Sequence, residues 1–148
     1  MIDTAPLMTI LVNVDKPVDL GLVAGQARRF VRILGGSVSG VHSGVVLPGG
    51  ADWQEAGPDG MLEIDARYVL DLDGALVEVR STGLRHGSPE VLGRLARGEI
   101  VPGSEYYFRT AMRFFTASPD LVGLNSTLAV AVGERQPGQV RLTVHAVK

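Results

Sequence analysis

The residues best suited to chemistry in this chain surround its single tryptophan. The segment Leu-Pro-Gly-Gly-Ala-Asp-Trp-Gln runs from Leu47 to Gln54, so Asp52 and Trp53 follow a glycine-rich loop that a ligand could approach closely. The indole of a tryptophan offers a flat apolar face and one hydrogen-bond donor, and a neighbouring carboxylate could move a proton. The pattern is also typical of a tryptophan that plugs a barrel end, with Asp52 capping loop amides, and both interpretations stay open.

A second set of acid-base candidates alternates with apolar residues later in the chain. Asp65 and Arg67 fall on one face of a predicted strand, where Glu78 or Arg109 could set their pKa values by mutual charge. Such a pair could transfer a proton to or from a substrate. Because the opposite face of residues 62–70 is the apolar one, the alternative is a solvated outer wall of ion pairs that each contribute less than about 1 kcal/mol.

Two neighbouring tyrosines present a similar choice. Tyr107 and Arg109 share one face of a predicted strand, while Tyr106 falls on the other face. A tyrosine beside an arginine can stabilise an enolate or phenolate as negative charge develops on oxygen. Tyr106 could line a ligand pocket or belong to the core, and Arg109 could instead pair with Glu105.

Asn125 and His42 are the remaining ligand-binding candidates. We expect Asn125 to begin a strand with small same-face neighbours, so its amide could reach into a cavity; the alternative is an asparagine that closes a turn. His42 is predicted to lie in the middle of a strand on a glycine-rich face, as a general base or as a hydrogen-bonded wall residue. Because the other histidines, His86 and His145, are widely dispersed in the sequence, we predict no metal site.

Composition is typical of a soluble single-domain protein. With 148 residues and 45% hydrophobic content, residues 1–148 can form one domain whose core needs no covalent staples. There are no cysteines, the start does not resemble a signal peptide, and no apolar run approaches the roughly 18 residues that span a bilayer, so we expect a cytoplasmic protein without membrane contact. The net charge of -2 argues against nucleic acid as a partner, although Arg28, Arg29 and Arg32 form one small basic cluster.

Apolar residues recur at every second position through most of the chain, which is the period of β-strands. The predicted strands cover residues 8–14, 30–34, 37–47, 62–70, 75–82, 106–115, 124–132 and 140–147. The dipeptide Asp73-Gly74 is typical of a type I′ turn, which would pair Leu70 with Val77 in a hairpin.

One segment is predicted to be a short helix. Ser88 suits the N-cap, Pro89 suits the first helical position, and Gly98 suits the end of the helix. We interpret Ser88-Pro89-Glu90 as structural and not as part of a site.

Short connections and the scarcity of helix favour antiparallel pairing. Gly36, Gly40 and Gly44 recur every four residues and would share one face, where they let a strand coil and leave space for bulky neighbours or a ligand. We therefore predict an all-β fold, an antiparallel β-barrel of about eight strands with one short helix.

Four motifs in this order along the chain resemble a known family. They are Leu47 to Gln54, Asp65 to Tyr68, Ser104 to Thr110, and Leu124 to Arg135. Together they are similar, over nearly the whole chain, to an uncharacterised bacterial and fungal family known as domain of unknown function 3237 or uncharacterised protein family 0311. The resemblance implies a single-domain antiparallel β-barrel that often self-associates, so we expect a homo-oligomer, with a dimer favoured. It implies no established reaction.

The chain departs from this family pattern at two places. Residues 120–123 read Asp-Leu-Val-Gly where relatives tend to have an aromatic residue, and His42 stands where no histidine is expected. An aromatic wall of the family's pocket could therefore be missing, and the ligand need not be shared.

Small barrels such as plant cyclases and dirigent proteins steer reactive apolar molecules without a cofactor, an analogy that concerns the fold alone. We predict that this chain binds a small, partly apolar or aromatic metabolite in a barrel cavity that Trp53 helps to line, and that it catalyses a cofactor-independent isomerisation, cyclisation or elimination. Asp65 or Asp52 would move the proton, and Trp53 would stack on the ligand. The oxygen atoms of the ligand would be held by Arg67, Tyr107, Arg109 and Asn125. The alternatives are a carrier or sensor that binds without turnover and a scaffold barrel with a filled interior.

Overall fold

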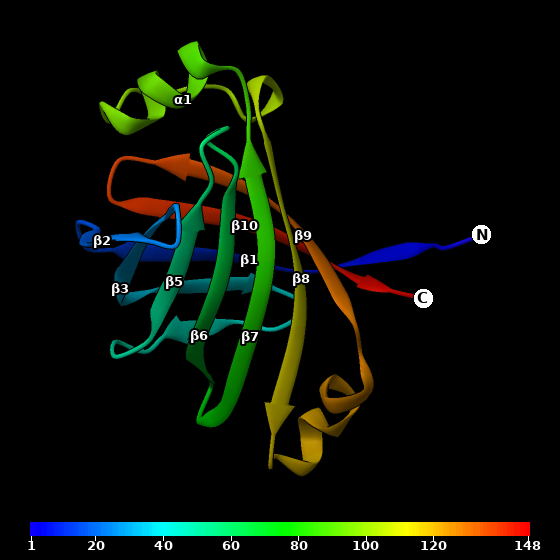
Figure 1. The fold of residues 1–148 in the computed structure, drawn as a ribbon. Coiled ribbons are helices and arrows are strands. Elements are labelled where there is room, and N and C mark those ends of the chain that lie inside the picture. The colour runs from blue at the N-terminus through cyan, green and yellow to red at the C-terminus, as the bar shows by residue number, and fades with distance from the viewer.

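The chain forms a closed antiparallel β-barrel in a computed structural model that describes residues 1–148 (Figure 1). Its strands are β1 (Thr4–Val14), β2 (Val18–Val23), β3 (Gln26–Gly40), β4 (Gly44–Val46), β5 (Ala51–Ala56), β6 (Leu62–Leu72), β7 (Ala75–His86), β8 (Tyr107–Thr116), β9 (Ala129–Gln136) and β10 (Gln139–Val147). The α-helix α1 (Pro89–Ala96) and the 3₁₀ helices η1 (Gly103–Glu105) and η2 (Pro119–Ser126) connect some of them. The predicted all-β barrel with one short α-helix is confirmed.

The barrel closes because its first strand pairs along both edges. β1 pairs with β10 on one side and with β3 on the other, and both ladders are antiparallel. Around the wall the order continues from β10 through β9, β8 and β7 to β6. The gap between β6 and β3 is bridged by β4 and then by β5, while β2 pairs only with β3 as an added strand.

The β6–β7 hairpin has the predicted register. Leu70 pairs with Val77, and Asp73 and Gly74 take positive φ angles of 55° and 93°, as a type I′ turn requires. The Asp71 carboxylate accepts a hydrogen bond of 2.7 Å from the Gly74 amide and holds the turn. Because side chains alternate across a strand, this register directs the apolar set inward and the charged set outward.

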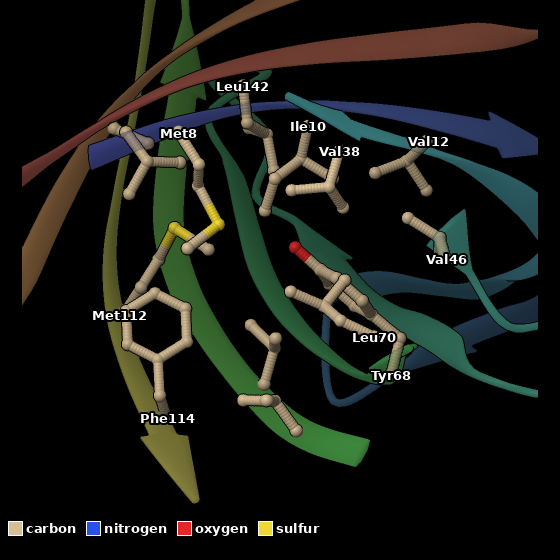
Figure 2. Close-up of a cluster of buried hydrophobic side chains, with 14 of the residues drawn as sticks. Met8, Ile10, Val12, Val38, Val46, Tyr68, Leu70, Met112, Phe114 and Leu142 are labelled. Carbon is tan, nitrogen blue, oxygen red and sulfur yellow. The ribbon is translucent and has the colours of Figure 1, made fainter. Parts of the chain in front are cut away.

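Apolar side chains fill the half of the barrel nearer η2. The main cluster draws on strands from the whole ring, and Ile10, Leu70 and Phe114 are fully buried in it. Figure 2 shows these side chains converging from several strands on one interior. The packing of these side chains leaves little room for a ligand in this half of the interior.

A second, smaller apolar cluster lies at the end of the barrel next to α1 (Figure 1). Leu95 of the helix is buried there in the same cluster as Leu62 and Phe108. The predicted cap is confirmed, since the Ser88 hydroxyl accepts a hydrogen bond of 3.2 Å from the Val91 amide. None of the helices combines the length and the apolar character needed to cross a bilayer.

Three glycines let neighbouring strands approach closely. A Cβ atom on Gly36 would lie 1.9 Å from the Leu11 carbonyl oxygen, and one on Gly44 would lie 2.0 Å from the Asp71 carbonyl oxygen. Gly40 is similarly close to the backbone of β1. The prediction that these glycines leave space for bulky side chains or a ligand is wrong, because the backbone of adjacent strands occupies that space.

Three parts of the predicted strand pattern need correction. The predicted strands do not include β2 or β5, because glycine interrupts β2 and polar residues hold the inward positions of β5. The predicted strand 37–47 is divided by a bend at residues 41–43. The predicted strand 124–132 begins inside η2, and β9 starts only at Ala129.

The Gly44→Ala variant is expected to lose about 1–3 kcal/mol of unfolding free energy, because its new methyl group would overlap the backbone of β6. Urea unfolding followed by circular dichroism measures this loss. Gly123→Ala is the matched control, since a Cβ atom there meets nothing within 4 Å. Equal stability of the two variants would contradict the close approach of β4 and β6.

Candidate active site

A small cavity with a mainly apolar lining and a few polar side chains lies inside the barrel between the filled half and the α1 end. Its volume is about 50 Å³, and its polar lining consists of Asp52, Tyr68, Ser81 and Thr110. These residues come from β5, β6, β7 and β8, which are neighbours in the wall and place them at adjacent inward positions. The remaining lining is apolar and includes members of both hydrophobic clusters. We call this space the polar cavity.

Asp52 is the acidic residue of the polar cavity. Its Oδ1 accepts a hydrogen bond of 3.1 Å from the Asp65 amide, and its Oδ2 accepts one of 2.7 Å from Gln54 Nε2. Gln54 is oriented in turn by Arg29, whose Nε donates to Gln54 Oε1 at 2.6 Å. Burial raises the pKa of Asp52 to about 6, although these hydrogen bonds and the charge of Arg29 oppose the rise. A carboxyl with a pKa near neutrality can accept or release a proton.

Two hydroxyl groups at the polar cavity have no hydrogen-bond partner in the protein. Tyr68 is 3% exposed and Thr110 is 4% exposed, and both hydroxyl oxygens are buried. Figure 2 shows the Tyr68 hydroxyl directed into the interior among apolar side chains. Burial, together with the charge of Asp52, raises the pKa of Tyr68, so this hydroxyl keeps its proton. An unpaired buried hydroxyl costs about 1–3 kcal/mol, and both groups have a hydroxyl proton that no protein atom accepts.

Three half-buried arginines face inward near the α1 end, and we call them the arginine cluster: Arg29 on β3, Arg85 on β7 and Arg135 on β9. Burial lowers the pKa of each, that of Arg85 to about 10. The positive charge of Arg29 lowers the pKa of Arg85 and Arg135 further, whereas the charge of Asp52 raises the pKa of Arg29 and Arg85. The cluster and the acid are therefore within electrostatic reach of one another.

Two of the predicted site residues face this region. Asp52 lines the polar cavity. Tyr106 is 7% exposed, and its hydroxyl accepts a hydrogen bond of 2.7 Å from the Arg135 amide, so it lies beside the arginine cluster. The structure thus brings Asp52 and Tyr106 to one end of the barrel interior, and their roles in catalysis and binding stay predictions.

Trp53, Asp65 and Arg67 face outward. Trp53 is 50% exposed, and its ring centroid lies 5.0 Å from that of Phe30 on the outer wall. The prediction that Trp53 lines an internal hollow is wrong, because alternation along β5 places it on the face opposite Asp52. Asp65 and Arg67 occupy exposed positions of β6, as in the alternative of a solvated outer wall, but neither forms a salt bridge.

Tyr107 and Arg109 also lie outside the barrel. The Arg109 guanidinium carbon is 5.2 Å from the Tyr107 ring centroid, and this ring stacks on His86 at 4.7 Å. Both residues line an open groove of about 620 Å³ over the outer face of β7 to β10. A neighbouring groove of about 460 Å³ contains Trp53 and Asp65. Because both grooves are open, the polar cavity is the better place to exclude water from a reaction.

Asn125 and His42 do not reach the interior site. Asn125 lies in η2, where its side chain accepts from the Thr116 amide at 2.8 Å and donates to the Thr116 carbonyl at 2.9 Å. This matches the alternative of a turn-closing asparagine. His42 lies in the bend between β3 and β4, so its predicted mid-strand position is wrong. No group of three or more histidine, cysteine or acidic side chains is gathered in a way that could hold a metal ion.

Sequence reasoning missed Tyr68, Thr110, Arg85 and Arg135 as site residues. Each occupies an inward position of a strand whose other inward residues are mostly apolar or small. The sequence does contain a signal for them, which is a polar side chain at an inward position of an otherwise apolar alternation. Burying such a group costs free energy unless it has a hydrogen-bond partner. The four residues come from the consecutive strands β6, β7, β8 and β9, and no single segment of the sequence reveals this order of pairing.

The Asp52→Asn variant is expected to be more stable than the natural protein above about pH 7 and nearly equal to it near pH 4. Because the folded-state pKa is raised from its ordinary 3.8 to about 6, the folded state retains a proton that the unfolded state releases between these values, so stability falls as pH rises through this window. The full difference corresponds to about 3 kcal/mol at most. Thermal unfolding of both proteins across this pH range measures it, and a difference that does not depend on pH would contradict the raised pKa.

Comparison with known proteins places this geometry in a family. Residues 3–147 match the family model described as protein of unknown function (DUF3237). A UPF0311 protein of Rhodopseudomonas palustris is 38% identical over 148 residues, which cover 99% of this chain and 97% of the relative. A UPF0311 protein of Clostridium acetobutylicum is 36% identical over 145 residues, covering 95% and 91%.

Solved structures show the same fold. A crystal structure of a conserved protein of unknown function from Rhodopseudomonas palustris has a TM-score of 0.97 at 37% identity, covering 100% of this chain and 99% of the other. A β-barrel-like protein from Acinetobacter baumannii has a TM-score of 0.87 at 37% identity, covering 100% and 97%. An enzyme from Penicillium herquei has a TM-score of 0.71 at 18% identity, covering 100% and 94%, a likeness in fold alone. Since the sequence match spans nearly the whole chain, this protein belongs to the DUF3237 (UPF0311) family.

Proposed function

We propose that the protein is a cofactor-independent enzyme that binds a small, partly apolar metabolite at the α1 end of the barrel and catalyses an isomerisation, cyclisation or elimination. The observation that carries this proposal is the Asp52 carboxyl, whose pKa is raised to about 6 and which faces the polar cavity beside the unpartnered hydroxyls of Tyr68 and Thr110. Proton transfer next to a carbonyl group needs an acid-base group and hydrogen-bond donors for the carbonyl oxygen, and both are present at this cavity.

The chemistry follows from these three groups. Ionised Asp52 would take a proton from a carbon atom next to a carbonyl, or from a hydroxyl group, of the bound molecule. The hydroxyls of Tyr68 and Thr110 would donate hydrogen bonds to the oxygen on which negative charge develops. Protonated Asp52 would then return the proton at a different atom, which completes an isomerisation, or to an atom made basic by ring closure or by departure of a leaving group.

The size of the polar cavity restricts how a substrate is bound. About 50 Å³ can hold a carbonyl group or a few water molecules but not a whole aromatic metabolite. We therefore place only the reacting group in the polar cavity. The body of the molecule would lie toward α1, against the apolar cluster that contains Leu62 and Phe108.

A carrier that binds without turnover is the second candidate. Both oxygens of Asp52 already accept hydrogen bonds from the protein, an arrangement that would also suit a carboxylate with a fixed binding role. A carrier would keep the ligand affinity and release the ligand unchanged.

Deuterium exchange from D2O separates these two functions. A panel of enolisable compounds, each supplied as a neutral ketone and as a related keto acid, is incubated with the protein and followed by NMR. We expect protein-dependent exchange or a rearranged product with at least one member, and loss of this activity in Asp52→Asn. Asp65→Asn is the matched control, because the side chain of Asp65 is exposed on the outer wall. Full activity of Asp52→Asn would exclude Asp52 as the acid-base group, and binding without exchange or product would favour the carrier.

The Tyr68→Phe variant is expected to be at least as stable as the natural protein and to exchange more slowly, by a factor on the order of 100. Stability should not fall, because the lost hydroxyl has no partner in the fold. Chemical unfolding and the exchange assay measure the two effects on the same sample. A variant that is destabilised while its exchange rate is unchanged would assign the hydroxyl to the fold and not to the reaction.

A further inference from the structure

The inward-facing charges at the α1 end do not balance. The arginine cluster contributes three guanidinium groups, and two acidic residues act on it: Asp52 at the polar cavity and Asp19, the exposed strand partner of Arg29 on β2. None of the salt bridges in the protein includes Arg29, Arg85 or Arg135. Half-buried positive charges that exceed the nearby negative charge repel one another and lose hydration, and both effects are unfavourable.

The three arginines differ in how much of their hydrogen-bonding capacity is used. Arg29 Nε donates to Gln54, and one Arg135 Nη donates to the carbonyl oxygens of Gln136 and Gln139 at 2.6 and 3.2 Å. Arg85, in contrast, has a buried Nε without any partner. A guanidinium group with a free Nε edge matches the two oxygens of a carboxylate in a bidentate hydrogen bond.

Tyr106 adds a further donor at the same place. Its hydroxyl oxygen accepts from the Arg135 amide, which leaves the hydroxyl proton free to donate. Tyr106 stands two residues before Phe108, the strand partner of Arg85, so both side chains lie at the same end of the barrel interior. Leu62 and Phe108, the strand partners of Arg85 on β6 and β8, belong to the apolar cluster under α1.

We infer that the substrate carries a carboxylate, bound by Arg85 with Arg29 and Arg135 around it, on a partly apolar body whose reacting group extends to Asp52. The inference rests on the proposed function for the position of the reacting group, whereas the binding of the carboxylate stands on the arginine cluster alone. The bound carboxylate would supply the negative charge that the cluster lacks and an acceptor for Arg85 Nε. The carboxylate and the reacting group would be separate groups of one small molecule, because Arg85 would hold the first while Asp52 exchanges a proton with the second.

Benzoate is the probe, because it combines a carboxylate with a compact apolar body and has no enolisable carbon. Its binding at low salt is measured by isothermal titration calorimetry beside benzamide, which has the same shape without the charge, and inorganic phosphate, an anion without the apolar body. We expect saturable benzoate binding that weakens as salt is added, and much weaker binding of benzamide and phosphate. Equal binding of benzamide, preference for phosphate, or no saturable benzoate binding would each overturn the assignment.

Arg85→Met tests the assigned residue. We expect it to weaken benzoate binding at least tenfold, while Arg80→Met, which removes an exposed arginine from the outer face of the same strand, leaves it unchanged. Arg85→Lys keeps the positive charge but removes the planar guanidinium group that can form two parallel hydrogen bonds, so this variant should bind benzoate more weakly than the natural protein. It provides the test if Arg85→Met fails to fold. Unchanged affinity in Arg85→Met or Arg85→Lys would overturn the inference.

The two proposals can fail separately. In the exchange assay, Arg85→Met should raise KM for the keto acids and leave the neutral ketones unaffected, whereas Asp52→Asn should abolish exchange for both. Benzoate binding that depends on Arg85, with exchange unaffected by Asp52→Asn, would keep the carboxylate site and reject the reaction. The opposite result is exchange that depends on Asp52 while Arg85→Met and the natural protein have equal kinetics on keto acids. It would support the proposed reaction and reject the carboxylate site.

Discussion

The β1–β3 ladder is the interaction on which the rest of the structure depends. It joins the first strand to the far edge of the sheet and so creates an interior from which water is removed. Gly36 makes this closure possible, because any side chain there would overlap the backbone of β1. Once the ring is closed, a one-residue step along a strand moves a side chain from inside to outside. On β5 that step separates a half-buried acid, Asp52, from an exposed indole, Trp53.

Local signals in the sequence predicted the local structure well. The alternation along β6 and β7 and the Asp73-Gly74 turn specify a hairpin and its register without reference to the rest of the chain. The site depends on contacts between residues far apart in sequence, and no local pattern reports them. Asp52 is turned inward by pairing of β5 with β3 and β6, and β5 has too few apolar residues to reveal its inner face. Arg85 and Arg135 come together because β7 and β9 both pair with β8.

The charged groups of the interior interact with one another and with their buried surroundings. Burial raises the pKa of Asp52 and lowers the pKa of each arginine, so both kinds of group are disfavoured in their charged forms. Their mutual attraction offsets part of this cost, and the hydrogen bonds through Gln54 link Asp52 to Arg29. The offset is incomplete, since positive groups outnumber the acid. A barrel selected for stability alone would be better served by apolar side chains of similar volume at these positions.

The two halves of the interior therefore have different tasks. The packed half around Leu70 and Phe114 stabilises the fold by burying apolar surface. This stabilisation offsets the free-energy cost of the unpaired hydroxyls and of the excess positive charge at the α1 end. The polar end can then change without loss of the fold, because few of its side chains contribute to the main cluster. In the proposed function, a change at the arginine cluster would alter which ligand is bound, while Asp52 and the closed wall would keep the same proton transfer available.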